Sequence, residues 1–490
     1  MIDSTGDGAG NTLSSPEGLV VAPCGTIYVA GGGSNNVFRI SPAGLVTQVL
    51  DGTGDGTNPM TGPTGLALDA SGNVFVSCVF SNNVFRVTPT GVVTQVMDAT
   101  GDGLGNTLSR PRGLAVDASG NLLVAGQLSN NAFRVTPGGV VTEIIDATGD
   151  GGGNTLNAPW ILAADGDDAL VAGRSSNNVF RVTPGGVVTE IIDSTGDGGG
   201  NTLLGPTGVA AGPSGNVYVT SVSNQRAFKI EPGGTVTQIL DVNGDGTNGV
   251  LNPWYVTVSE DENVYVSCLS SSNAFEITPG GTVTEIIDST GDGSGNTLSQ
   301  CFGLAVQPGT GSVFVSGNGS SNAFRIEGSP SFPAFCDASD GALGTCPCAA
   351  FQGLPTTGCD TPISPMQGGG LTGGFRLDVL RQTSGATNRA TLCGTGFPQL
   401  SAPGVTVIRA PNQTVGGPFV FGDGVLCIGP TVVRVGADLA LGGTFLDTVG
   451  HGSMAGPGSF YYQLWVRSTP ISFCDPSAAF NLSNGREIVW

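Results

Sequence analysis

Positive charge is scarce in this chain. It has 17 lysines and arginines, of which Lys229 is the only lysine, against 38 aspartates and glutamates, and its formal net charge is −21. Its single histidine is His451. A chain without basic clusters lacks the surface that binds nucleic acid or an anionic membrane. The sequence argues against both kinds of partner, and acidity in loops fits divalent cations better.

Long apolar runs and helical periodicity are missing as well. No stretch of about 18 apolar residues is present, so we expect no membrane span. Glycine (82 residues) and proline (30 residues) are abundant, which in other chains is a mark of disorder. Here regular runs of Val, Ile and Phe lie between the glycines, a pattern typical of short strands joined by turns. The sequence therefore predicts an all-β protein.

The chain does contain a repeat. The phrase Asp-x-Thr-Gly-Asp-Gly, with Asn243 in place of Thr in one copy, recurs at intervals of 47 or 48 residues. Its copies begin at Asp3, Asp51, Asp98, Asp146, Asp193, Asp241 and Asp288. A period between about 20 and 50 residues is the mark of a solenoid, an array or a propeller.

One unit reads as four short strands. In the third copy these are residues 113–117, 121–125, 131–136 and 140–145, and Gly, Pro, Asn and Ser turns separate them. Four antiparallel strands without a helix are typical of a propeller blade. Seven copies predict a seven-bladed β-propeller over residues 1–327. The recurring phenylalanines are expected between the blades: Phe38, Phe85, Phe133, Phe180, Phe228, Phe275 and Phe324.

The two ends of the repeat region are incomplete. The last copy stops at residues 325–327 without its fourth strand, and the chain begins without the strand that precedes each other Asp loop. We therefore expect the ring to close weakly or to be truncated. Met1 opens directly inside a repeat and no signal peptide is present, so we expect the natural N-terminus to lie upstream.

The C-terminal part has a different composition. Residues 328–335 resemble a linker, and the period is lost over residues 336–490. Seven of the eleven cysteines lie in this last segment, which predicts a small disulfide-rich β-sandwich in an oxidising compartment, outside the cell or at its surface. Cys24 and Cys301 would lie in adjacent blades of a closed ring, where a disulfide could staple it.

Two phrases carry a family resemblance. Pro111-x-Gly-Leu-Ala-Val-Asp-x-x-Gly-Asn and Asn178-Val-Phe-Arg-Val-Thr-Pro-Gly-Gly-Val-Val-Thr-Glu resemble NHL-type repeats. The second is also similar to the repeat of the virginiamycin B (streptogramin) lyase family, which implies a seven-bladed propeller. That family uses a catalytic histidine and a metal ion, but His451 lies outside the repeats, so no catalytic residue is carried over.

Related gluconolactonase-like propellers hold a metal with Glu, Asn and Asp at the central channel. Here Glu17 stands at a channel-mouth position, and its equivalents are not acidic: Thr64, Arg112, Trp160, Thr207, Trp254 and Phe302. The C-terminal segment resembles a domain that ends many large secreted bacterial proteins, through phrases such as Cys346-Pro-Cys348 and Tyr461-Tyr-Gln-Leu-Trp465. That resemblance implies export.

The Asp loops are candidate calcium sites. Asp241-Val-Asn243-Gly-Asp245-Gly246 copies the opening of a calcium loop, with oxygens at positions 1, 3 and 5 and Gly at position 6. No copy has the Glu at position 12, so we expect weak affinity, about 10⁻⁴–10⁻³ M. The alternative is a tight turn in which Asp caps backbone N–H groups. The candidate ligands are Asp3, Asp7, Asp51, Asp55, Asp98, Asp102, Asp146, Asp150, Asp193, Asp197, Asp241, Asn243, Asp245, Asp288 and Asp292.

Residues that differ between copies mark a second candidate site. At the channel mouth these are Glu17, Arg112, Trp160, Trp254 and Phe302, with Phe80, Gln127, Arg174 and Tyr255 nearby. Tryptophans beside polar groups in a concave mouth suit a protein, peptide or carbohydrate ligand. Alternatively, these side chains only plug the channel. The sequence thus favours a non-catalytic binding propeller, with a metal-dependent lyase or lactonase of the propeller class as the alternative.

Overall fold

The computed structural model describes residues 1–23 and 25–327 in full, and the backbone of ten strands between residues 376 and 489. The chain divides into two compact units, one formed by Met1–Gln307 and Gly311–Gly328, the other by Pro308–Thr310 and Ser329–Trp490. In the described part no helix is long and apolar enough to cross a membrane.

The first unit is built from seven antiparallel sheets, each with its strands in chain order. Blade 1 contains β1 (Pro16–Val21), β2 (Ile27–Gly31), β3 (Asn36–Ile40) and β4 (Val46–Leu50). Blade 2 contains β5 (Pro63–Leu68), β6 (Val74–Cys78), β7 (Asn83–Val87) and β8 (Val93–Met97). Blade 3 contains β9 (Pro111–Val116), β10 (Leu122–Gly126), β11 (Asn131–Val135) and β12 (Val141–Ile145). Blade 4 contains β13 (Pro159–Asp165), β14 (Asp168–Gly173), β15 (Asn178–Val182) and β16 (Val188–Ile192).

The remaining blades follow the same plan. Blade 5 contains β17 (Pro206–Ala211), β18 (Val217–Ser221), β19 (Arg226–Ile230) and β20 (Val236–Leu240). Blade 6 contains β21 (Pro253–Val258), β22 (Val264–Cys268), β23 (Asn273–Ile277) and β24 (Val283–Ile287). Blade 7 has three strands, β25 (Cys301–Val306), β26 (Val313–Gly317) and β27 (Asn322–Ile326). The predicted seven-bladed propeller is thus confirmed.

Packing of each sheet between two neighbours explains the sequence pattern. All residues of the second strands except Asp168 of β14 are buried, as in β2 and β10, because both faces of the sheet meet an adjacent blade. Strands of this kind read as continuous apolar runs and not as an alternation. The predicted inter-blade phenylalanines are all buried; six are fully inaccessible and Phe324 is 6% exposed.

The inner ends of the blades approach closely, and the first and last blades meet in the same way. A Cβ on Gly65 would lie 2.0 Å from the carbonyl oxygen of Arg112 in the next blade, and a Cβ on Gly303 would lie 2.3 Å from that of Glu17. Only glycine allows strands to pack at this separation. The hydroxyl of Ser316 also donates to the Glu17 carbonyl, at 3.2 Å. The ring therefore closes at its centre.

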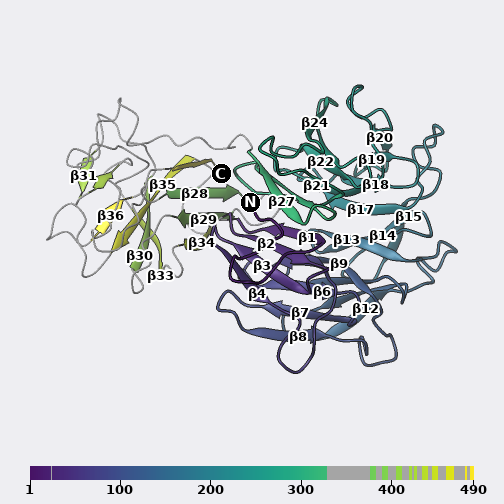
Figure 1. Ribbon diagram of the computed structural model, residues 1–490, viewed down its shortest axis with the longest axis horizontal. Helices are drawn as coiled ribbons and strands as arrows, with labels where there is room; N and C mark the ends of the chain where they lie inside the picture. Colours follow the sequence, from purple (N-terminus) through teal and green to yellow (C-terminus); the bar gives the residue numbers. More distant parts are fainter. Residues whose placement is uncertain are drawn as a thin grey trace. The chain divides into compact units, whose positions relative to one another are not determined.

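At the outer edge, closure depends on the chain's first residues. Ile2 forms an antiparallel bridge with Ala323, whose N–H donates to the Ile2 carbonyl at 3.0 Å. Figure 1 shows the N-terminus beside β27. Of the two expected alternatives, weak closure or a truncated ring, the structure shows a closed ring in which a single residue takes the place of the fourth strand of blade 7. The expected Cys24–Cys301 staple is not formed either: Cys301 is a buried free thiol, and Cys24 lies outside the described residues.

The second unit is described as strand backbone alone. One sheet contains β28 (Arg376–Arg381), β29 (Arg389–Thr395) and β34 (Thr444–Gly450). A second sheet contains β30 (Gly404–Ala410), β33 (Val433–Leu439), β35 (Ser459–Arg467), β36 (Phe480–Leu482) and β37 (Arg486–Val489). A third pairs β31 (Phe419–Phe421) with β32 (Gly424–Leu426). The predicted linker over residues 328–335, the disulfides of residues 336–490 and the His451 side chain lie outside the described residues.

Candidate functional site

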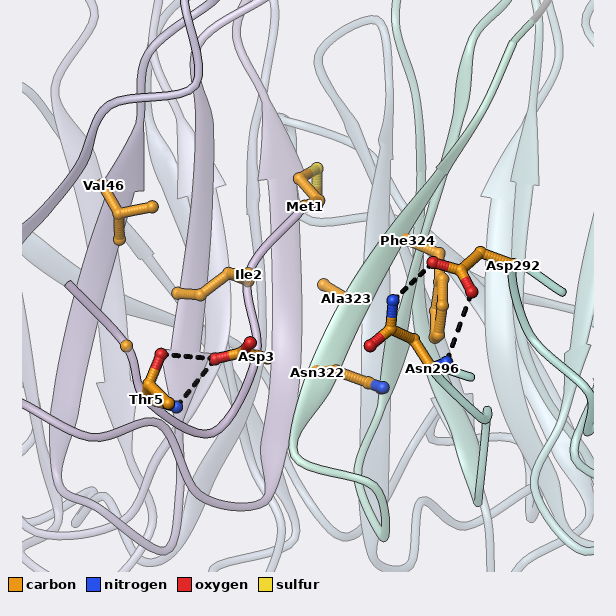
Figure 2. Close-up of a pocket in the computed structure, with 11 residues that line it drawn as sticks. Met1, Ile2, Asp3, Thr5, Val46, Asp292, Asn296, Asn322, Ala323 and Phe324 are labelled. Atoms are coloured by element: carbon orange, nitrogen blue, oxygen red, sulfur yellow. Dashed lines mark hydrogen bonds between the residues drawn. The ribbon is translucent and has the colours of Figure 1, made fainter. Parts of the chain in front are cut away.

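The aspartates of the repeated loops bond to their own loops. In the loop between blades 3 and 4, Asp146 Oδ1 accepts from the Thr148 N–H at 2.8 Å and from its hydroxyl at 2.5 Å. Asp150 Oδ1 accepts from the Gly152 N–H at 2.8 Å, and its Oδ2 accepts from the Asn154 amide at 2.7 Å. Figure 2 shows the same bonds at Asp3 and at Asp292.

The two loops that are one residue shorter keep this arrangement. Asp55 accepts from the N–H and side-chain amide of Asn58, and Asp245 accepts the same two bonds from Asn248. Their asparagine stands at the eighth position of the loop, one position earlier than in the longer loops. In both loop lengths the amide donates a hydrogen bond to the carboxylate.

A glycine makes each turn possible. Gly149 has a φ of +68°, and a Cβ there would lie 1.8 Å from the Asn154 carbonyl oxygen and 3.1 Å from the ring of Phe180. The loop therefore folds back on itself directly over the inter-blade phenylalanine. The repeated phrase encodes a compact cover for the core of each blade.

These bonds lower the carboxyl pKa values. The Asn58 N–H and amide hold the pKa of Asp55 at about 2, and the Asn248 and Thr247 N–H groups do the same for Asp245. In the described part of the chain, no three His, Cys, Asp or Glu side chains converge as metal ligands would. The calcium sites predicted from these aspartates and Asn243 stay a prediction.

The channel-mouth residues, in contrast, meet one another across the ring. Glu17, Arg112, Trp160, Trp254 and Phe302 are each the second residue of the first strand of their blade. The Trp160 and Trp254 rings make an edge contact with centroids 5.6 Å apart, and the Trp254 and Phe302 centroids are 5.5 Å apart. We call these five residues, with Gln127, Arg174 and Tyr255, the channel-mouth cluster.

Arg112 is the better-paired cation of this cluster. Its Nη1 lies 3.7 Å from Glu17 Oε2, and its Nε donates to Gln127 Oε1 at 2.8 Å. Its guanidinium carbon lies 3.9 Å from the centroid of a Trp160 ring. One face of the guanidinium therefore stacks on the indole, while its N–H edge pairs with the Glu17 carboxylate and donates to Gln127.

Arg174 contacts only aromatic faces. It follows β14, and its guanidinium carbon lies 4.5 Å from a Trp160 ring centroid and 5.2 Å from that of Trp254. Within the described residues its guanidinium has no hydrogen-bond acceptor or carboxylate partner. Beside it, Trp254 is 8% exposed and its buried Nε1 has no partner either. Two strong donors are thus held together without an acceptor.

Burial shifts the charges of the cluster. It raises the pKa of Glu17, an effect that the nearby Arg112 opposes. It lowers the pKa of Arg112, which Glu17 opposes, and it lowers the pKa of Arg174 with no carboxylate to oppose it. Burial also raises the pKa of Tyr255. Both arginines are therefore partly stripped of water, and their charge is incompletely balanced.

One nearby residue was not among the sequence predictions. Arg110 precedes β9, and its guanidinium carbon lies 5.8 Å from the ring of Phe80, which is 63% exposed. The equivalent position in other copies holds small or neutral residues such as Ser15 and Ala158. Arg110 is the one charged residue among the seven equivalents, and this difference between the copies is the sequence signal that marks it.

Comparison with known proteins gives a likeness of fold. No family model and no curated protein matches the chain. A streptogramin B lyase structure aligns with a TM-score of 0.51 and 15% identity over 62% of this chain and 91% of that chain. A virginiamycin B lyase from Staphylococcus aureus aligns with the same score and identity over 65% and 95%. Its catalytically inactive form with quinupristin gives 0.50 and 15% over 64% and 94%. The chain is a seven-bladed β-propeller similar in fold to these lyases.

Proposed function

We propose that this protein is an exported, non-catalytic binding propeller whose ligand occupies the channel-mouth cluster. The observation that carries the proposal is the buried Trp254 Nε1, which has no acceptor among the described residues, beside the partly exposed Arg174 guanidinium, which contacts only aromatic rings. A buried donor without an acceptor costs about 1–3 kcal/mol. A side chain that only plugged the channel would not need such a donor, whereas a ligand acceptor would remove the cost.

The chemistry of the cluster selects the kind of ligand. The cluster contains two guanidiniums and one carboxylate, and Glu17 pairs with Arg112, so an incoming carboxylate would balance the charge of Arg174. The Trp160 and Trp254 faces offer a flat apolar surface against which a sugar ring or an aromatic side chain can stack. We therefore propose a carboxylate-bearing carbohydrate or acidic peptide as the ligand, with uronic acids as the simplest probe.

A metal-dependent lyase or lactonase is the second candidate, favoured by the fold it shares with the lyases. The mouth supplies one carboxylate for such chemistry, and Glu17 lies against Arg112 at 3.7 Å. Incubation of the full chain with quinupristin and a divalent cation tests this candidate directly. Formation of a new product would replace the binding proposal with catalysis.

Tryptophan fluorescence tests the binding proposal, because Trp160 and Trp254 both stand in the cluster. We expect saturable quenching by glucuronate and none by glucose, which carries a CH₂OH group where glucuronate carries the carboxylate. Arg174→Met should weaken glucuronate binding at least about tenfold while changing stability by less than about 0.5 kcal/mol. Arg86→Met is the control, since Arg86 lies on β7 outside the cluster. Equal quenching by both sugars, or undiminished binding by the Arg174 variant, would contradict the proposal.

A further inference from the structure

Arg86 is a cation without a partner at the contact between blades 2 and 3. Its Nε is buried and has no acceptor, and its guanidinium makes no ion pair within the described residues. The arginines at the same strand position of the next two blades are paired. Arg134 Nη2 donates to the Asp167 carbonyl at 2.7 Å, and Arg181 Nη1 lies 2.7 Å from Asp165 Oδ2. A buried donor without an acceptor is unfavourable, so an acceptor supplied by a ligand would stabilise this contact.

Arg86 also lines a pocket. The pocket has a volume of about 610 Å³, which is in the range of small-molecule sites. Phe75, Val96 and Pro137 give it an apolar wall, and Arg86 and Asp69 are its charged lining residues. Asp69 already accepts three hydrogen bonds from its own turn. The pocket therefore combines apolar surface with a cation that lacks a partner.

The turn of blade 3 that borders the pocket contains Gly120, where the turn of blade 6 has Glu262. The N–H of each donates to the carbonyl three residues earlier, so the two residues hold the same place in their hairpins. Glu262 reaches back to blade 5, where its Oε1 accepts from the Ser214 N–H at 2.7 Å and its Oε2 from the Tyr218 hydroxyl at 2.6 Å. Phe75 stands at the place of Tyr218 in its blade. A carboxylate thus fills the equivalent space between blades 5 and 6.

The contact between blades 3 and 4 is filled in a similar way. Asp167 Oδ1 accepts from the Ser119 N–H of the preceding blade at 2.8 Å, and the Asp167 carbonyl accepts from Arg134. Asp117, the equivalent of Asp69, lies beside it with its Oδ2 3.4 Å from Arg134 Nε. One arginine therefore accommodates the aspartate of its own blade and an acidic residue of the next blade together.

We propose that the pocket between blades 2 and 3 binds a small carboxylic acid with an apolar body, whose carboxylate takes the place that acidic side chains of the chain fill at the two other contacts. The Arg86 guanidinium pairs with the carboxylate, and the apolar body lies against Phe75, Val96 and Pro137. The site is independent of the channel-mouth cluster. Its lining contains no tryptophan, so tryptophan quenching at the mouth does not report on it.

The test titrates the full chain into 4-fluorophenylacetate and follows the transverse relaxation rate of the probe's ¹⁹F signal. We expect saturable binding. Binding should be at least about tenfold weaker for 4-fluorophenylacetamide, which has the same shape without the charge, and for the acid with Arg86→Met. Arg174→Met is the control for the channel mouth and should change the affinity for the acid by less than about twofold.

Gly120→Glu offers a second variant, because it supplies the carboxylate from the chain itself. Glu262 has a φ of +62° at this place and Gly120 has +81°. A Cβ on Gly120 would have one neighbour within 4 Å, Pro137 Cγ at 3.8 Å, so there is room for the side chain. We expect this variant to lose probe binding. Gly215→Glu is the matched control, since it adds the same charge at a φ of +83° in the equivalent turn of blade 5, and it should keep probe binding.

Four results would overturn the proposal. If 4-fluorophenylacetate does not bind the unmodified chain, the pocket is not a carboxylate site. If the acid and the amide bind equally, the pocket recognises the apolar body alone. Binding that survives Arg86→Met but is lost with Arg174→Met would place the probe at the channel mouth. An equal loss of binding in Gly120→Glu and Gly215→Glu would show that added negative charge, and not a filled pocket, weakens binding.

Discussion

The Asp loops and the channel-mouth cluster make opposite use of the repeat. The loops place the same side chains in every copy, and their polar groups bond to one another, as Asp150 does to Asn154. The mouth places five kinds of side chain at the same strand position of the seven copies. Among the described residues the Trp254 Nε1 has no acceptor, and the Arg174 guanidinium contacts only aromatic rings. The loop residues, which are nearly the same in every copy, form their hydrogen bonds within one loop. The mouth residues, which differ between copies, contact one another only because the ring brings the blades together.

The largest effect should come from the turn glycine of a loop. Gly149→Ala places a Cβ 1.8 Å from the Asn154 carbonyl oxygen at a positive φ, so we expect a loss of about 3 kcal/mol from overpacking and backbone strain. Urea unfolding of the full chain measures it. Gly151→Ala is the matched control, because its φ is +67° but no atom lies within 4 Å of the added Cβ; about 1 kcal/mol is expected. Equal losses would show that the loop does not have to close on Asn154.

Acid should act on the two regions with opposite sign. Carboxyl groups with lowered pKa values stabilise the fold above their unfolded values near 3.8, and this contribution is lost as the pH falls toward their folded values, about 2 for Asp55 and Asp245. Thermal melts should therefore show falling stability between about pH 4 and pH 2. The groups concerned are Asp3, Asp7, Asp51, Asp55, Asp102, Asp150, Asp197, Asp245, Asp288 and Asp292.

Glu17 should show the reverse dependence at higher pH. Its folded pKa is raised above 4.5 by burial, so its ionised form destabilises the native state above the folded pKa, and the penalty is relieved as the pH falls toward 4.5. Burial also raises the pKa values of Glu143, Glu190 and Glu285, so Glu17→Gln should reduce this gain of stability on mild acidification without abolishing it, and should leave the loss below pH 4 unchanged. A variant with an undiminished gain would show that Glu17 does not contribute to it.

Calcium should have the smallest effect. A ligand that binds only the native state must raise the Tm, but the loop carboxylates already accept hydrogen bonds from their own loops. We expect a rise of at most about 2 °C between excess chelator and 10 mM Ca²⁺. Magnesium at the same concentration controls for ionic strength. A rise of 10 °C would place the loops among true calcium sites, and no rise would leave them as hydrogen-bonded turns.

Much of the fold could be read from local patterns. The spacing of the Asp phrase predicted seven blades, and the Val, Ile and Phe runs predicted their strands, because a repeat unit repeats its local conformation. Closure could not be read in this way. Ile2 replaces a whole strand in blade 7, and a single bridging residue leaves no periodic signal. The same reasoning identified the residues of the mouth but not their partners, since the stacking of Arg174 on two tryptophans joins different blades.

The sequence by itself determined the all-β class, the number of blades and the self-contained turns at positions such as Gly149, since each depends on contacts within one unit of 47 or 48 residues. Only the tertiary structure decided which divergent residues meet. Glu17 of blade 1 reaches Arg112 of blade 3, and Ile2 bridges to Ala323 of β27, because ring closure joins residues that no local pattern relates.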